Sequence, residues 1–317
     1  MEQAKSNTKI AGIDIGKSKL DVAVHGLEDA VQVDNEKVGF AALIDWLRAR
    51  DVGRVGMEAT GGYERGVRLA LDAAGFEVVV HQPLEVRIFA KLKRLKAKND
   101  KADARLIAAA TAQVDAVRAA QDPRLADLAE RLTAYEQITD QAADLKTFME
   151  HVTLKDLKRE LLNQIKSLLR LKAKLAAEIL RRVKTHADLL ARYRLVISLP
   201  GIGPIVGLTL VIRMPELGQM RHGQAAALIG VAPYDRDSGQ YKGLRFITGG
   251  RGRPRKMLYL AALSAKRYDP RLKAFADQLL ARGKPPKVAI VAVMRKLIEA
   301  ANLVLQRQQP WVKTHAA

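Results

Sequence analysis

The sequence predicts an α/β domain followed by a mainly helical region, so the expected fold class is α/β plus α. Short apolar runs alternate with amphipathic helical patterns through residue 115. From Asp122 to Val183, apolar residues recur at steps of three and four, which is typical of long helices. Beyond Leu199, glycine-rich connectors separate further helical patterns. We therefore expect three parts, at residues 1–115, 122–190 and 195–317.

The stretch Lys9–Gly16 is expected to form the central strand of the first part. Its apolar residues make a run too short for a helix, and Lys19–Val24 alternates as a second strand of a hairpin. Asp14 lies inside the first strand, where an unpaired carboxylate would be costly to bury. We expect a compensating partner, and a metal ion is the natural candidate. Two other interpretations remain open: Asp14 caps a turn, or the stretch is the first phosphate loop of an actin-like kinase.

The next segments complete the order of the first part. We expect strands at residues 30–34, 54–60 and 77–81, and helices at 39–50, at 61–74 and from Pro83 onward. This β-β-β-α-β-α-β-α order is that of the ribonuclease H-like fold, a mixed sheet with helices on its faces. Glu58 lies near the end of its strand, where open α/β sheets place their ligands.

Asp100 and Asp103 are expected on one face of a helix, because residues three apart are neighbours on a helix surface. Acidic residues are also favoured at a helix N-terminus by the helix dipole, so a purely structural role is the alternative. The cations expected to flank a metal site here and to contact phosphates are Lys98, Lys101 and Arg105. Together with Asp14 and Glu58, these two aspartates can hold two divalent ions, and oxygen-only ligands suit Mg²⁺ or Mn²⁺.

The charge balance predicts a polyanionic partner. The chain carries 54 Lys and Arg against 34 Asp and Glu, a net charge of +20, and from Gly201 onward 20 cations face only six anions. No cysteine is present, and the six histidines are not at ligand spacing, so a zinc site is not expected. No signal peptide or long apolar run occurs, so we expect a soluble cytoplasmic protein with no membrane partner.

The long apolar stripes between Asp122 and Val183 predict two helices joined near Thr153, as a helical hairpin or coiled coil. One alternative is an internal arm. The other, which we favour, is a subunit interface, so that the protein is a homo-oligomer, a dimer or a tetramer.

The C-terminal part is predicted to bind nucleic acid. Leu199–Thr209 resembles a helix-hairpin-helix segment, in which Gly201 and Gly203 let backbone N–H groups approach a phosphate. Basic residues then alternate with glycine and aromatic residues, and the expected contacts are Arg236, Lys242, Arg245, Arg251, Arg253, Arg255 and Lys256. Ser238 lies among them before Gly239, although Asp-Ser-Gly is also an ordinary turn sequence.

Five segments, in order along the chain, resemble the IS one-ten (IS110) family of insertion-sequence transposases, which includes the pilin-gene DNA invertases. They are Gly12–Lys17, Gly56–Gly61, Lys98–Ala104, Leu199–Gly203, and Gly230–Pro233 with Ser238-Gly239. The resemblance runs nearly end to end, and the conjunction is far more specific than any one segment.

The resemblance implies an N-terminal RuvC-like domain, a coiled-coil middle and a C-terminal transposase domain. It assigns Asp14, Glu58, Asp100 and Asp103 to a metal-binding catalytic tetrad and Ser238 to the nucleophile. It also implies catalytic domains that meet across subunits, and a bridge RNA that pairs with donor and target DNA.

Two other functions are compatible with the residues alone. In a RuvC-like Holliday-junction resolvase, metal-activated water would cut DNA and Ser238 would be a turn residue. In a non-catalytic nucleic-acid-binding protein, the carboxylates would be helix or turn caps.

Overall fold

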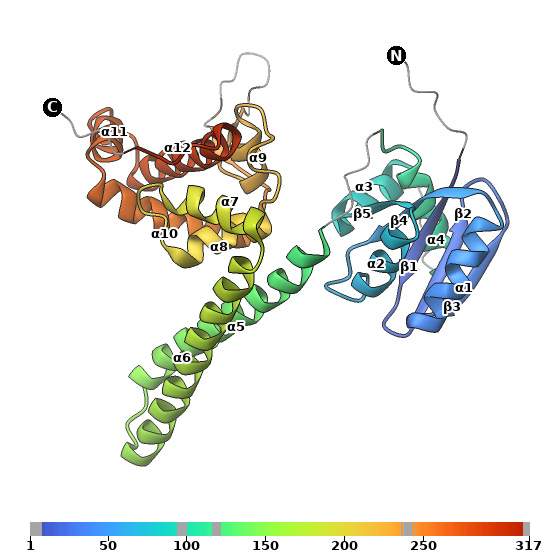
Figure 1. Cartoon of the computed structure of the whole chain (residues 1–317), viewed down its shortest axis with the longest axis horizontal. Coiled ribbons are helices and arrows are strands. Elements are labelled where there is room, and N and C mark those ends of the chain that lie inside the picture. The colour runs from blue at the N-terminus through green and yellow to red at the C-terminus, as the bar shows by residue number, and fades with distance from the viewer. Residues whose placement is uncertain are drawn as a thin grey trace. The chain divides into compact units, whose positions relative to one another are not determined.

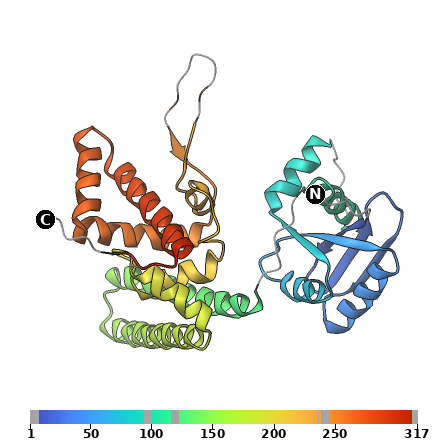
Figure 2. The same cartoon turned by 45° about the horizontal axis from the view of Figure 1, so that its top comes forward.

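The computed structural model describes residues 8–93, 100–115, 122–235, 237, 243 and 245–312; for residues 100–102 it describes the backbone. The chain divides into two compact units, Met1–Pro123 (unit 1) and Arg124–Ala317 (unit 2) (Figures 1 and 2). Each unit has its own hydrophobic core.

Unit 1 is built on a five-stranded mixed sheet in the order β3-β2-β1-β4-β5. The first three strands form an antiparallel meander, whereas β1, β4 and β5 are parallel. The strands are β1 (Lys9–Ile15), β2 (Lys19–Val24), β3 (Ala30–Asp34), β4 (Val52–Glu58) and β5 (Glu77–His81); the helices are α1 (Lys37–Arg48), α2 (Arg65–Ala73), α3 (Pro83–Leu92) and α4 (Asp100–Thr111). This arrangement confirms the predicted ribonuclease H-like, RuvC-like α/β fold.

The two faces of the sheet are covered by different helices. Ile13 of β1 and Met57 of β4 belong to the core cluster that includes Leu43 of α1 and Leu71 of α2. Because side chains alternate along a strand, the residues on either side of these two face the other way. That second face lies against α4.

Helix α4 approaches β1 so closely that backbone meets backbone. A Cβ atom on Gly12 would lie 2.2 Å from the carbonyl oxygen of Ala104 and 2.3 Å from the amide nitrogen of Ala108. On β4, a Cβ on Gly56 would collide with the hydroxyl of Thr111. Glycine on both strands is therefore what allows α4 to lie on this face.

Unit 2 begins with an arm of two long helices, α5 (Pro123–Glu150) and α6 (Lys155–Lys184), which run side by side as a hairpin (Figures 1 and 2). The prediction of two long helices joined near Thr153 is confirmed. Much of the apolar stripe seen in the sequence is turned inward: Leu132, Ala142 and Ile165 are buried. Leu132 shares one core cluster with Ile179 of α6 and with residues of the remaining helices, so part of the stripe is buried within unit 2.

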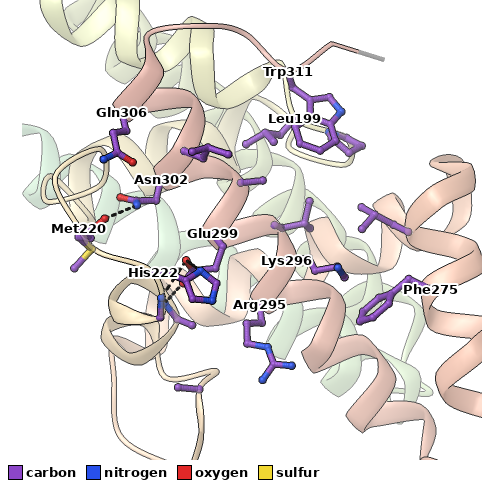
Figure 3. Close-up of a pocket in the computed structure, with 18 of the residues that line it drawn as sticks. Leu199, Met220, His222, Phe275, Arg295, Lys296, Glu299, Asn302, Gln306 and Trp311 are labelled. Carbon is purple, nitrogen blue, oxygen red and sulfur yellow. Dashed lines mark hydrogen bonds and ion pairs between the residues drawn. The ribbon is translucent and has the colours of Figure 1, made fainter. Parts of the chain in front are cut away.

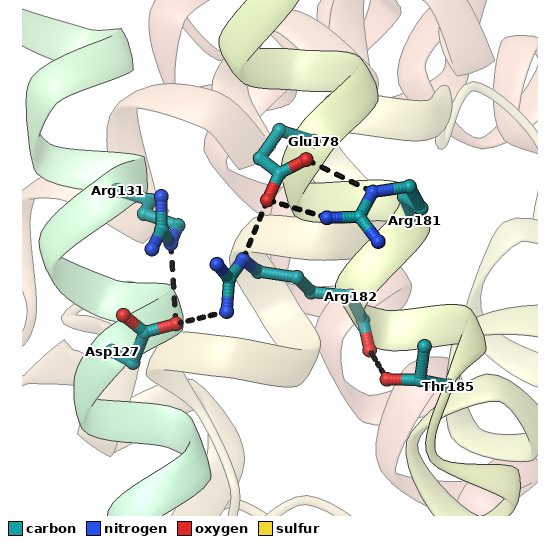
Figure 4. A network of polar contacts seen from close by, with 6 residues as sticks. All are labelled: Asp127, Arg131, Glu178, Arg181, Arg182 and Thr185. Carbon is teal, nitrogen blue, oxygen red and sulfur yellow. Dashed lines mark hydrogen bonds and ion pairs between the residues drawn. The ribbon is translucent and has the colours of Figure 1, made fainter.

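Charged contacts tie the two helices together where the arm meets the rest of unit 2 (Figure 4). Arg182 of α6 donates to its own helix at Glu178 over 2.7 Å and pairs with Asp127 of α5 at 3.3 Å. Arg131 also donates to Asp127, at 3.2 Å. The two carboxylates therefore link three guanidinium groups across the seam, including that of Arg181.

The remainder of unit 2 is a helical bundle. Its helices are α7 (Ala187–Ile197), α8 (Pro204–Arg213), α9 (Gln224–Ile229), α10 (Gly252–Tyr268), α11 (Pro270–Ala281) and α12 (Pro286–Arg307), and two short strands, β6 (Pro233–Tyr234) and β7 (Phe246–Ile247), form a hairpin. Residues 206–212 of α8 are all buried, so this helix runs through the core. The predicted helical C-terminal region is confirmed, although α7, α9, α11 and the β6–β7 hairpin were not predicted.

The contact of α4 with Gly12 gives a direct test of the fold. Gly12→Ala should lower the free energy of unfolding by about 1–3 kcal/mol, because the new methyl group would overlap backbone that cannot rotate away. Urea denaturation followed by circular dichroism measures this.

Gly203→Ala is the matched control. Gly203 has a φ of −79°, and an added Cβ there would meet no other atom within 4 Å. Equal stability of the two variants would contradict the close packing of α4 on β1.

Candidate active site

A row of polar side chains crosses the α4-covered face of the sheet. Asp14 is paired with Asp21 across the β1–β2 ladder, and Glu58 is paired with His81 across β4–β5. Ile13 and Met57 are register partners on the parallel strands β1 and β4, so Asp14 and Glu58 occupy the next step. Asp14 and Glu58 lie two residues after Gly12 and Gly56, so they share the face of these glycines. Asp21 and His81 lie opposite Asp14 and Glu58 on the neighbouring strands and therefore share that face as well.

The row lies where the parallel strands end. Asp14 is the second-last residue of β1 and Glu58 is the last residue of β4. Adjacent strands are about 4.8 Å apart, so the two backbones hold these carboxylates as neighbours. The structure thus brings together the two strand-borne members of the predicted tetrad.

The other two predicted carboxylates lie in the first turn of α4. Asp103 is half-buried and precedes Ala104, the residue whose carbonyl touches Gly12. The side chain of Asp100 lies outside the described residues. Among the side chains that are described, no three carboxylates or imidazoles form a cluster able to hold a metal ion. The complete tetrad therefore stays a prediction.

The loops that follow the two strands are held by side chains that the sequence analysis did not single out. Asn35 donates to the carbonyl of Gly16 at 2.9 Å and to that of Tyr63 at 3.2 Å, which links the loop after β1 to the loop after β4. Glu64 accepts from the amides of Thr60 and Gly62. Burial acts to raise the pKa of Glu64. Hydrogen bonds from its own backbone amide, from the hydroxyl of Thr60 and from these two amides outweigh it, so the pKa lies below its ordinary value.

His81 lies at the end of the row, on β5. Its Nε2 lies 2.8 Å from the hydroxyl of Thr111, and that hydroxyl donates its own proton to the carbonyl of Ile107. In the tautomer that satisfies both contacts, Nε2–H donates to the hydroxyl of Thr111. Burial lowers the pKa of His81, which the carboxylate of Glu85 only partly opposes. Both Asp21 and His81 could have been found from sequence only with the strand register in hand.

The cations predicted around the metal site are only partly described. Lys98 and the side chain of Lys101 lie outside the described residues. Arg105 is described, and it pairs with Glu28 at 2.8 Å. Its charge is thus met by a carboxylate within unit 1.

The basic cluster predicted at the start of α10 is largely engaged in contacts within unit 2. Arg251 pairs with Glu216, with one contact at 2.8 Å, and donates to the carbonyl of Arg213 at 2.6 Å. Arg253 pairs with Glu136 of α5, and Lys256 pairs with Asp140 one turn further along α5 at 3.0 Å.

Arg255 donates to the backbone carbonyls of Gly230 and Gly249. Together with its neighbours it therefore helps to fasten α10 to the arm and to the loop after α9. A role of these four cations in nucleic-acid binding stays a prediction.

The loop between β6 and β7 contains Ser238, Arg236 and Lys242, which lie outside the described residues. Its base is described. Arg245 pairs with Asp235 at 2.6 Å and with Asp237 at 2.7 Å, and the hydrogen bond to Arg245 lowers the pKa of Asp237. Arg245, predicted to contact phosphate, is thus engaged in ion pairs at the base of the loop that contains Ser238.

The two glycines of the helix-hairpin-helix-like segment have different surroundings. Gly201 has a φ of +74°, and a Cβ there would lie 2.3 Å from the carbonyl oxygen of Ala261 in α10. Gly203 precedes α8 and has open space on its side. Packing thus accounts for Gly201, whereas a phosphate contact at either glycine stays a prediction.

Comparison with known proteins gives two family matches. Residues 11–156 match the profile of DEDD-type IS110 sequences, described as "Transposase". Residues 193–277 match the profile described as "Transposase IS116/IS110/IS902 family".

Individual relatives are more distant. The pilin gene-inverting proteins of Moraxella lacunata and Moraxella bovis are each 25% identical over 321 residues, covering 95% of this chain and 97% of the relative. Two structures of Thermus thermophilus RuvC, one in complex with a Holliday junction substrate, are 20% and 18% identical. They cover 33% of this chain and 93% of RuvC, with a TM-score of 0.28. Among the described residues, no helix is long and apolar enough to cross a membrane.

The buried His81 predicts a pH dependence of stability. Its folded pKa lies below the unfolded value of about 6.5, so the unfolded chain binds more protons. The contribution of neutral His81 is therefore complete above about pH 6.5 and is lost as the pH falls below it.

Urea unfolding at about pH 7.5 and about pH 5.5 measures the loss. His81→Gln, whose amide can still donate to Thr111, should show a smaller loss of stability than the wild type. An identical loss in both proteins would show that His81 does not cause it.

Proposed function

The protein belongs to the IS116/IS110/IS902 family of transposases and is a DNA-recombining enzyme; from this premise we propose that it cuts and rejoins DNA by metal-assisted attack of Ser238. The observation that supports this most is the position of Asp14 and Glu58, one step beyond the register partners Ile13 and Met57. Both lie on the face of the sheet that is covered by α4, the helix that carries Asp103.

The proposed metal ligands are Asp14, Glu58, Asp100 and Asp103. Their donors are all carboxylate oxygens, which fits Mg²⁺ or Mn²⁺. Bound there, such ions would supply stabilisation of the charge that develops on the phosphate. The role of the protein is to hold these carboxylates in place. The hydrogen bonds of Asn35 and Glu64 support the loops beside them.

Ser238 is the proposed nucleophile. Its Oγ forms a bond to the phosphorus of the scissile phosphodiester and gives its proton to solvent. The bond from phosphorus to the departing strand oxygen breaks, and that oxygen takes up a proton from solvent and becomes a free hydroxyl. The resulting phosphoserine bond retains the energy needed for rejoining. Arg245 pairs with Asp235 and Asp237 at the base of this loop.

Assembly through the arm is part of the proposal. Apolar side chains beside the inward-facing seam remain exposed on α6, among them Leu162 at 41% and Leu169 at 39%. They are seven residues apart and so lie on one face of the helix. A second copy that covers them would give a homodimer or a tetramer, in which unit 1 of one subunit could act with Ser238 of another.

Donor and target DNA are the proposed substrates, and a structured bridge RNA is the proposed guide. The guide rests on the family resemblance, and the net charge of +20 is compatible with two nucleic-acid partners.

The serine mechanism is tested by Ser238→Ala. The variant should bind DNA normally but form no covalent adduct, because no hydroxyl remains to attack. After denaturation and nuclease digestion of a wild-type reaction, mass spectrometry should find a nucleotide on the peptide that contains Ser238. Ser167→Ala, on the exposed surface of α6, is the control. Full strand exchange by Ser238→Ala would favour the water-using resolvase.

The metal site is tested by Asp14→Asn and Glu58→Gln. Each should reduce DNA cleavage more than about 100-fold, since a carboxylate ligand is lost while the fold is kept. Asp34→Asn removes an exposed strand carboxylate that pairs with Lys19, and it should leave cleavage unchanged. Cleavage at the wild-type rate by either variant would exclude that residue as a ligand.

Assembly is tested by Leu162→Glu with Leu169→Glu. Light scattering should show a smaller particle than the wild type, because the charges would be buried unpaired at the interface. Gln164→Glu with Ser167→Glu adds two charges to another face of the same helix and should leave the mass unchanged. An unchanged mass of the leucine variant would show that this face is not an interface.

A further inference from the structure

A hollow of about 980 Å³ opens in unit 2 beside α9, α11 and α12 (Figure 3). Its apolar lining includes Leu199, Met220, Phe275 and Trp311. Leu199 and Trp311 lie together at one end in Figure 3, and the side chain of Lys296 points toward Phe275. This volume is at the upper end of the range typical of small-molecule sites.

Four cations also line the hollow: Arg221, Arg271, Arg295 and Lys296. The ion pairs recorded among the described residues include none of these four, in contrast to Arg251, Arg253 and Lys256 of α10. Lys296 instead lies 4.4 Å from the ring centre of Phe275.

Two carboxylates line the hollow, and both are engaged. Asp269 accepts from the amide of Leu272 at 3.0 Å, and Glu299 holds the wall beside α9. Glu299 accepts from the amides of Gly223 and Ala226 at 3.2 and 3.1 Å and lies 3.3 Å from His222. Asn302 likewise holds the loop before α9, by donating to the carbonyl of Met220 at 2.8 Å. The polar groups at this end thus fix the wall, whereas the four cations have positive charge to offer a ligand.

An apolar, aromatic lining with cations beside it matches one nucleotide. A base has an apolar face that stacks on aromatic side chains, and its phosphates attract Arg and Lys. Two further lining residues belong to segments that are expected to contact nucleic acid. Pro200 belongs to the turn before α8, and Pro233 lies on β6, five residues before Ser238 in the sequence.

We propose that this hollow binds one unpaired nucleotide of a nucleic-acid strand, with the base against Phe275 and Trp311 and the flanking phosphates at Arg295 and Arg271. The base must be unpaired because a duplex buries its base faces in the stack. The inference rests on the proposed function in taking nucleic acid as the partner, and DNA and RNA share the chemistry recognised here.

Binding of fluorescent 12-nucleotide single strands of DNA and of RNA, and of the matching DNA duplex, tests the site. The measurements are made on the full chain with EDTA present, so that strand cleavage plays no part. Phe275→Ala and Arg295→Gln should each weaken binding of the single strand by about 10-fold, the loss expected for one base–aromatic contact or one strong phosphate contact. Duplex binding should change little.

Matched controls lie on the same bundle outside the hollow. Tyr268→Ala removes an aromatic ring that is 74% exposed, and Arg282→Gln removes a charge at the end of α11. Both should bind single strands like the wild type. A larger loss with DNA than with RNA, or the reverse, identifies which strand occupies the site.

Photocrosslinking of the wild-type chain to a strand containing 5-iodouracil provides a readout that needs no variant. The crosslinked peptide should contain Phe275 or Trp311. The proposal is overturned by wild-type binding of both variants, by equal losses for single strand and duplex, or by crosslinks confined to other peptides. Loss of recombination in Ser238→Ala with these results intact would bear on the serine mechanism alone, and a Ser238→Ala variant that still recombines would leave this site unaffected.

Discussion

The contact of the α4 backbone with Gly12 is the constraint on which unit 1 depends. A helix this close leaves no space for side chains at the crossing point, so β1 and β4 present glycine there. The next residues on that face, Asp14 and Glu58, come where the strands end. The same contact draws the first turn of α4 toward β1, so packing and the placement of carboxylates are one arrangement. A bulky residue at Gly12 would disturb both at once.

Charge is used differently in the two places where unit 2 concentrates it. Two cations at the start of α10, Arg253 and Lys256, face carboxylates of α5, and such partly exposed pairs orient helices more than they stabilise them. The cations beside α11 and α12 have no recorded carboxylate partner among the described residues. A net charge of +20 therefore does not identify the binding surface by itself. Part of the positive charge of unit 2 is engaged in ion pairs within the unit itself.

Periodicity and glycine position predicted the order of strands and helices in unit 1 and the two helices of the arm, because both signals are local. The partners of the α10 cations could not be predicted, since Glu136 lies 117 residues from Arg253 and only tertiary packing joins them. Asp21 and His81 required the strand register, which periodicity does not fix. The β6–β7 strands have two residues each, too few to give a pattern. The stripe of the arm was compatible with both an internal contact and an interface. The structure buries part of it within unit 2, and the interface stays a prediction.

The ion pairs at Glu136 and Asp140 fasten α5 to α10 near the base of the arm, whereas the turn of the hairpin lies beyond Glu150. Inserting or deleting seven residues in each helix beyond this base would preserve the seam, because seven residues are close to two full turns. Each such step would move the turn by about 10 Å. The length of the arm is therefore independent of the bundle, and it can differ among related proteins while the packing of the bundle stays the same.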